Sequence, residues 1–238
     1  MTATGAEGTG RQDAPGATAP AASATASATP TASARTGWAA RLAGPVDTGR
    51  AYRWLLLIAG VVGLIGSTVL TLDEIKLLKN PNYVPSCSIN PVISCGSVMK
   101  SAQAHVFGFP NPLLGLACFA VVATVAVVVL SGAELPGWIW LGLQAGTLFG
   151  AGFITWLMDQ TLYSIGALCP YCIAVWLATI ALFWYTLLHN IRHGVLPAPA
   201  WARAFAGSWY HWVVPALWYF VIAMLILNRF WYYWRTLI

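Results

Sequence analysis

Four of the five cysteines form two pairs whose spacing suits thiol chemistry. Cys169 and Cys172 make a C-x-x-C motif, Cys-Pro-Tyr-Cys, at the start of an apolar run. If that run is a helix, the partial positive charge at its amino end stabilises a thiolate, and a dithiol with a lowered pKa exchanges rapidly. The motif is also half of a zinc site, or two structural cysteines, but we favour dithiol redox chemistry.

Cys87 and Cys95 enclose seven residues, so a disulfide between them closes a short loop and adds only modest stability. We expect this disulfide to be exposed and easily reduced, which suits an electron shuttle better than a permanent staple. A fixed staple remains an alternative, as does an all-cysteine zinc site, which we disfavour because it would lie at a membrane surface in an oxidising compartment. We expect no metal.

The composition places these cysteines in a membrane protein. Charged residues make up 8% of the 238 residues and hydrophobic residues 58%, whereas soluble domains carry about 25% charged residues. These values exclude a soluble globular enzyme. Scattered basic residues, despite a net charge of +5, argue against a nucleic-acid partner. Five apolar runs are long enough to cross a bilayer: Trp54–Leu72, Pro112–Leu130, Trp138–Met158, Gly166–Leu188 and Trp212–Trp231.

These runs divide the chain into three parts. Residues 1–50 read as a disordered cytoplasmic tail, because the first 35 are almost all Ala, Thr, Ser, Gly and Pro. Residues 51–190 hold four transmembrane helices, and residues 191–238 hold an inner loop and a fifth. Between the first two runs, Cys95–Val106 has helical periodicity and Ser94 can cap it, which predicts a short interfacial helix. His105 within it could accept a proton during thiol exchange, but we interpret it as an ordinary interfacial polar residue.

Topology brings the two pairs to one side of the membrane. Each pair follows an odd-numbered span, so all four cysteines face the same compartment. Cys118 lies inside the second span and is excluded from the site as a small apolar core residue. Segments on the amino-terminal side hold seven Lys and Arg residues against five on the other side, which favours a cytoplasmic N-terminus and extracytoplasmic cysteines. Disulfides persist there.

Two dithiols on one face indicate a relay, in which one pair meets a thiol partner and the other meets an electron acceptor. Because the C-x-x-C opens a membrane helix, we expect a lipid-soluble acceptor, and a quinone fits. Within the third span, Gly142, Gly146 and Gly150 form a smooth ridge that predicts close packing of a neighbouring helix.

At this point the sequence resembles the vitamin K epoxide reductase family, in its bacterial branch without a fused thioredoxin domain. The resemblance covers roughly residues 50–190. It rests on the two cysteine pairs and on the residues between them: Val98, Ser101 and the Gly108-Phe-Pro-Asn-Pro-Leu-Leu-Gly115 segment. It implies an all-α integral membrane fold, with a four-helix bundle around a quinone of the menaquinone or ubiquinone type.

The resemblance also implies roles for individual residues. Cys172 would face the quinone, Cys169 would exchange with Cys95, and Cys87 would meet the external partner. Asn111 matches a family residue that hydrogen-bonds a quinone oxygen, although an Asn there also suits a helix cap. Trp176 stands where vertebrate members have a second polar contact, a Tyr, so quinone binding is expected but epoxide reduction is not.

The expected function is therefore a quinone-dependent thiol oxidoreductase of a bacterial cell membrane. It would reoxidise a separate DsbA-like thioredoxin-fold protein and so generate disulfides. Two alternatives remain: a thiol-driven quinone or vitamin K epoxide reductase running in the other direction, and a non-enzymatic membrane scaffold whose disulfides are structural.

Overall fold

The computed structural model describes residues 31–90 and 92–235. Five of its helical segments are long and apolar enough to cross a membrane, which confirms the expected all-α membrane fold. They are α2 (Arg50–Lys79), α4 (Asn111–Leu130), α5 (Gly137–Asp159) with its π-helical extension η2 (Gln160–Ile165), α6 (Pro170–Arg192), and α8 (Val213–Arg229) with the preceding 3-10 turn η3 (Trp209–Trp212).

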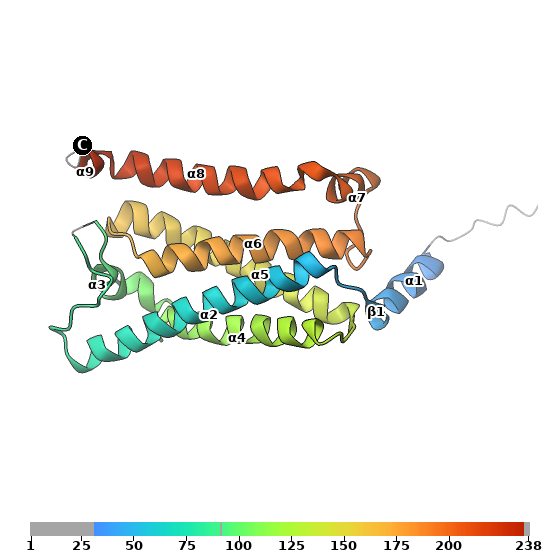
Figure 1. The fold of residues 1–238 in the computed structure, drawn as a ribbon, viewed down its shortest axis with the longest axis horizontal. Helices are drawn as coiled ribbons and strands as arrows, with labels where there is room; N and C mark the ends of the chain where they lie inside the picture. The colour runs from blue at the N-terminus through green and yellow to red at the C-terminus, as the bar shows by residue number, and fades with distance from the viewer. Residues whose placement is uncertain (1–30, 91, 236–238) are drawn as a thin grey trace, which may run out of the picture.

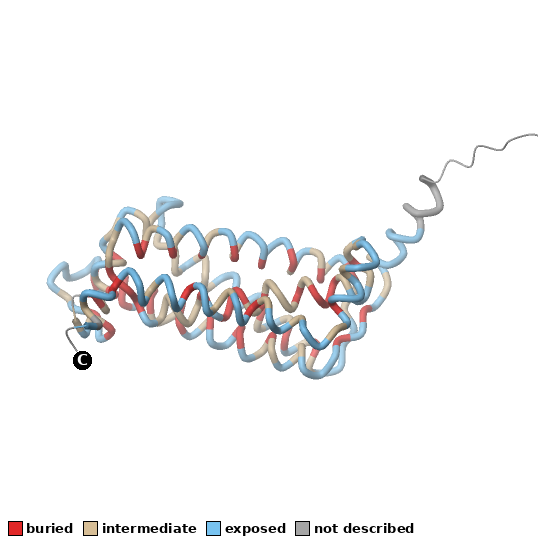
Figure 2. Tube along the Cα trace, turned by 90° about the horizontal axis from the view of Figure 1, so that it is seen from above, coloured by how far each residue is buried: buried red, intermediate tan, exposed pale blue. Residues whose placement is uncertain are grey.

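The four helices α2, α4, α5 and α6 run side by side and form the bundle (Figure 1). Helix α2 packs against α4 and α6, and α5 packs against α6. Glycines allow the α2–α4 contact to be close: a Cβ on Gly63 would overlap the ring of Phe119, and one on Gly60 would lie 3.2 Å from the backbone nitrogen of Ala123. Buried residues recur along the inward faces of these helices, and the outward faces are exposed (Figure 2).

The cysteine pairs lie at one end of the bundle, which we call the cysteine end. There, α3 (Cys95–Met99) and the 3-10 turn η1 (Ala102–His105) connect α2 to α4. The expected interfacial helix is thus present, but it is interrupted at Lys100 and Ser101. Ser94 caps α3 as predicted, because its side chain accepts a hydrogen bond from the Ser97 backbone N–H at 3.3 Å.

Local sequence signals fix where α5 ends and α6 begins at the cysteine end. The last turn of α5 widens into the π-helix η2, a form that often marks functional sites. Gly166 then adopts a left-handed conformation with φ of +68°, which stops the helix. Pro170 occupies the first position of α6, where its missing N–H is harmless, so Cys169 is the N-cap residue.

The opposite end of the bundle carries more structure than expected. We predicted a disordered tail over residues 1–50; residues 1–30 lie outside the described chain. Residues 31–49 include the helix α1 (Thr31–Ala43) and the strand β1 (Pro45–Val46), which pairs antiparallel with β2 (Leu135–Pro136). The Trp38 indole donates to the Val195 carbonyl at 2.9 Å, so this segment is anchored to the bundle.

Helix α8 lies beside the bundle rather than within it (Figure 1). It follows the short helix α7 (Ala200–Gly207), and the one-turn helix α9 (Trp231–Trp234) follows it. Its main neighbour is α6: the Tyr219 hydroxyl donates to the Leu177 carbonyl at 2.9 Å, and Trp218 meets Phe183 edge to face. Most of its large apolar side chains are exposed, as suits a helix that faces lipid.

Candidate functional site

A short backbone pairing holds the two cysteine-bearing segments together. The Ser94 N–H donates to the Leu168 carbonyl at 2.9 Å, and the Leu168 N–H donates to the Val92 carbonyl at 2.7 Å, forming a parallel β-bridge. Cys95 and Cys169 are the next residues in the two segments. Because the backbones are fixed one residue earlier, these two side chains are held next to each other.

The sulfur atoms are close enough for exchange. Cys87 and Cys95 form a disulfide, whereas Cys169 and Cys172 are free thiols. The Cys95 Sγ lies 3.1 Å from the Cys169 Sγ, and the sulfurs of Cys87, Cys95 and Cys169 all lie within 4.8 Å of one another. The prediction that both pairs reach the same end of the bundle is therefore confirmed, and the contact between the pairs is Cys95 to Cys169.

Three neighbouring sulfurs could also suggest a metal centre. In this state, however, Cys87 and Cys95 are bonded to each other, and a metal ligand must be a thiolate. Cys169 is then left as the single free thiol of the cluster, which is too few for a zinc site. The cluster as it stands is arranged for disulfide exchange.

The environment of Cys169 favours its thiolate. The Cys172 thiol donates a hydrogen bond to the Cys169 sulfur, and this lowers the pKa of Cys169 below that of an ordinary thiol. Backbone N–H groups of Tyr171 and Cys172 act in the same direction, whereas burial and the charge of Asp73 oppose it. A stabilised thiolate at Cys169 favours exchange with Cys95 in either direction, as the group that attacks the adjacent disulfide or as the group that a mixed disulfide releases.

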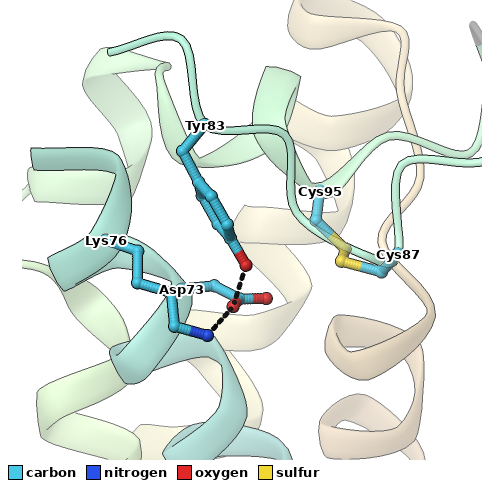
Figure 3. A network of polar contacts seen from close by, with 5 residues as sticks. All are labelled: Asp73, Lys76, Tyr83, Cys87 and Cys95. Atoms are coloured by element: carbon cyan, nitrogen blue, oxygen red, sulfur yellow. Dashed lines mark hydrogen bonds and ion pairs between the residues drawn. A yellow bond between two sulfur atoms is a disulfide. The ribbon is translucent and has the colours of Figure 1, made fainter. Parts of the chain in front are cut away.

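A polar brace fixes the loop that carries Cys87 (Figure 3). The Tyr83 hydroxyl donates to the Asp73 Oδ1 at 3.0 Å, and the Lys76 ammonium lies 3.5 Å from the same oxygen. Asp73 is buried, with 5% of its side chain exposed, although it belongs to the last turns of α2. The brace therefore ties the start of the loop to the bundle. It involves residues that the sequence analysis did not single out.

The expectation of an exposed disulfide is wrong. Cys87 is 7% exposed and Cys95 is fully buried. Both pack in an apolar cluster with Leu70, Leu77 and Met99, because the loop folds back onto the end of α2 and onto α3. The disulfide is therefore covered by apolar side chains in this state.

Behind the cysteines, a cavity of about 460 Å³ lies between α2, α4, α5 and α6, within the usual size range of small-molecule sites. Most of its lining is apolar. Cys172, Asn111 and Trp176, the residues expected to contact a quinone, all line it. Trp176 is 3% exposed and packs against Ile154 of α5.

Asn111 lines this cavity and does not cap α4, whose N-cap residue is Pro110. Its Nδ2 donates to the Gln103 carbonyl at 2.8 Å, and this bond uses one of two amide hydrogens. Its Oδ1 is buried with no hydrogen-bond partner among the described residues. An unpaired buried amide oxygen costs about 1–3 kcal/mol, so a bound molecule with a complementary polar group would be stabilised there. The second amide hydrogen of Asn111 can donate to a quinone oxygen, and the Oδ1 can accept from a quinol hydroxyl, so the residues present fit this head group.

The cavity opens sideways between α4 and α5. Both helices line it, and some lining residues are largely exposed, such as Val121 (60%) and Phe149 (53%). The glycine ridge of α5 belongs to this wall, so the prediction that it packs a neighbouring helix is wrong for Gly142 and Gly146: a Cβ on either would meet nothing within 4 Å. Gly150 alone of the three approaches another helix, with Thr179 Cγ2 3.2 Å from such a Cβ.

Cys118 also lines this cavity and is exposed, so its interpretation as a core residue is wrong. The reason is that its face of α4 borders the opening rather than another helix. It lies outside the sulfur cluster formed by the other cysteines.

The sequence analysis missed a buried acidic residue at the same cavity. Glu74 lines the cavity and is 3% exposed, and its Oε1 lies 3.2 Å from the Nε2 of His105. Its Oε2 has no hydrogen-bond partner among the described residues. The sequence did contain a signal for it, because the Asp73-Glu74 pair directly follows the apolar run Trp54–Leu72. Carboxylates in or beside a membrane helix are rare and often functional.

The comparison with known families agrees with this site. The model of the vitamin K epoxide reductase family matches residues 54–187, more than half of the chain and the whole of the site. No curated protein matches the chain. The family match spans both cysteine pairs, Asn111 and Trp176. The chain belongs to the vitamin K epoxide reductase family.

Proposed function

We propose that this protein is a quinone-dependent thiol oxidoreductase that reoxidises a separate DsbA-like thioredoxin-fold protein outside the cytoplasm. Family membership supports the reaction class, and the multi-pass fold supports a membrane location. The excess of Lys and Arg in segments on the amino-terminal side supports a cytoplasmic N-terminus. In this orientation the cysteine end faces the oxidising compartment of a bacterial cell.

One observation carries the proposal: the 3.1 Å contact between the Cys95 and Cys169 sulfurs. A permanent staple has no need of a free thiol with a lowered pKa against it. Thiol–disulfide exchange requires that arrangement, because the attacking sulfur must approach one sulfur of the disulfide. The contact therefore favours a relay over the scaffold alternative.

In the relay, a thiolate of the reduced partner attacks Cys87, and the Cys87–Cys95 bond breaks. The second partner thiol then displaces Cys87, which leaves the partner oxidised and the loop pair reduced. The Cys95 thiolate next attacks Cys169 of an oxidised C-x-x-C pair and releases Cys172 as a thiolate. Cys87 displaces Cys169 from Cys95, so two electrons have moved to the C-x-x-C pair.

The residues that line the cavity would pass these electrons from the C-x-x-C pair to the quinone. A bound quinone supplies a two-electron, two-proton acceptor. Asn111 would donate its uncommitted amide hydrogen to a quinone oxygen, and its unpaired Oδ1 would accept from a hydroxyl of the quinol. Trp176 would form an apolar wall, and Cys172 would deliver the electrons. The sideways opening between α4 and α5 allows an apolar molecule to enter from the bilayer.

The test is quinol formation by the purified protein in detergent, with a reduced DsbA-like protein as electron donor. We expect quinone-dependent oxidation of the donor by the wild type and its loss in Cys172→Ala. Cys118→Ala is the matched control, because it removes a cavity cysteine outside the sulfur cluster, and it should retain activity. If the wild type reduces neither menaquinone nor ubiquinone analogues and its cysteines resist mild reductant, the scaffold alternative holds.

A further inference from the structure

The proposed reaction moves electrons and protons by different routes. Electrons reach the cavity through attack of thiolates on disulfides, and this exchange carries no protons. The partner's two thiols release their protons at the outer surface, and formation of a quinol consumes two protons inside the cavity. The bundle therefore needs a path for protons from the cysteine end into an apolar cavity.

Glu74 and His105 have the geometry of such a path. The His105 side chain is 34% exposed and its Nε2 lies 3.2 Å from the Glu74 Oε1. Glu74 lines the cavity, and its Oε2 is buried with no partner among the described residues. One end of this pair thus meets water, and the other end is a buried oxygen at the cavity wall.

The unpaired second oxygen does not by itself distinguish Glu74, because the Oδ2 of Asp73 is also buried with no partner among the described residues. Its location does, because Glu74 lines the cavity and Asp73 does not. The neighbouring carboxylate, Asp73, serves a different purpose, since its Oδ1 is held by Tyr83 and Lys76 in the loop brace. Cys169 and Cys172 are the free thiols at the start of α6 that line the same cavity. Among these groups, Glu74 is the one at the cavity wall that has a direct contact with a partly exposed histidine.

We propose that His105 and Glu74 relay protons from the outer water to the cavity. His105 takes a proton from water at Nδ1 and passes one from Nε2 to the Glu74 Oε1, and tautomerisation of the ring restores the Nε2 proton before the next cycle. Rotation of the carboxyl group turns the protonated oxygen toward the cavity, where the acid releases its proton, and the carboxylate then accepts the next. Two such cycles balance the two electrons of one turnover. The inference rests on the proposed function, because it assigns the proton supply of the same site.

The first test compares quinol formation by the wild type, Glu74→Gln and His105→Gln. General acid–base groups contribute about 100-fold or more to rate, so we expect a loss of about that size in Glu74→Gln. In His105→Gln, added imidazole should restore part of the rate, because the site is partly exposed. Asp159→Asn removes an exposed carboxylate at the same end and should leave the rate unchanged.

The second test needs no quinone. Infrared difference spectra, recorded while the C-x-x-C pair is reduced chemically, should contain a carboxyl band that is absent from Glu74→Gln. Exchange of this band in D₂O should be slower in His105→Gln than in the wild type. Intact Cys87–Cys95 disulfides in both variants would show that they are folded.

The outcomes separate the two proposals. A wild type that reduces no quinone would overturn the proposed function. If the wild type is active, two results would overturn the proton relay. One is a Glu74→Gln variant with the same rate and pH profile as the wild type, and the other is a carboxyl band that exchanges equally fast with and without His105.

Discussion

Removing one hydroxyl should open the loop that carries Cys87. Tyr83→Phe deletes the donor of the 3.0 Å hydrogen bond to Asp73, whose carboxylate is buried. A hydrogen bond to a charged group is worth about 1.5–3 kcal/mol. Lys76 at 3.5 Å keeps part of the brace. Because about 1.4 kcal/mol corresponds to a factor of ten in an equilibrium constant, the open state should become about 10- to 100-fold more populated.

The assay is the rate at which dithiothreitol reduces the Cys87–Cys95 disulfide, followed by alkylation and mass spectrometry. Both cysteines are buried, so reduction should depend on opening, and Tyr83→Phe should accelerate it by about the same 10- to 100-fold factor. Tyr163→Phe is the matched control, because Tyr163 is 60% exposed in η2 at the same end of the bundle, and it should leave the rate unchanged. Equal rates in Tyr83→Phe and the wild type would refute the idea that the brace controls access to Cys87.

Three further predictions follow from the site and its walls. Because the pKa of Cys169 is lowered, the rate of its alkylation should rise with pH and reach its plateau at a lower pH than for an ordinary thiol, whose pKa is about 8.5. Cys172→Ala removes the hydrogen-bond donor and should move this profile to higher pH. An unchanged profile would contradict the hydrogen-bond explanation. Gly146→Leu should leave the thermal stability unchanged, because a Cβ at this position meets nothing within 4 Å. It should slow turnover with long-chain quinones more than with short-chain ones, because Gly146 lines the cavity. Gly63→Leu should instead destabilise the fold by about 1–3 kcal/mol, measured by thermal unfolding in detergent, because the side chain would overlap the ring of Phe119.

The sequence predicts the transmembrane helices well because their signals are local. Apolar length alone identifies the five spans, and parity along the chain then brings the two cysteine pairs to one end. The capping role of Ser94 and the helix start at Pro170 are also readable from residue type. These features depend on composition and on neighbours in sequence, so they need no knowledge of packing.

Features that depend on packing between distant segments could not be predicted in this way. Gly142 and Gly146 have the spacing of a helix contact, yet they face a cavity because α4 does not close against α5 at that position. Burial of the Cys87–Cys95 disulfide depends on how the loop folds onto α2. The sequence likewise contains Glu74 and His105, separated by 31 positions, without a signal that they meet.

The most direct test of the relay is to trap its central bond. In a protein with both Cys87→Ala and Cys172→Ala, Cys95 and Cys169 lose the partners that would resolve a disulfide between them. The 3.1 Å separation of their sulfurs predicts that mild oxidation in membranes yields a Cys95–Cys169 disulfide, which mass spectrometry of the digested protein would identify. Recovery of both cysteines as free thiols after oxidation would contradict transfer of electrons between the two pairs.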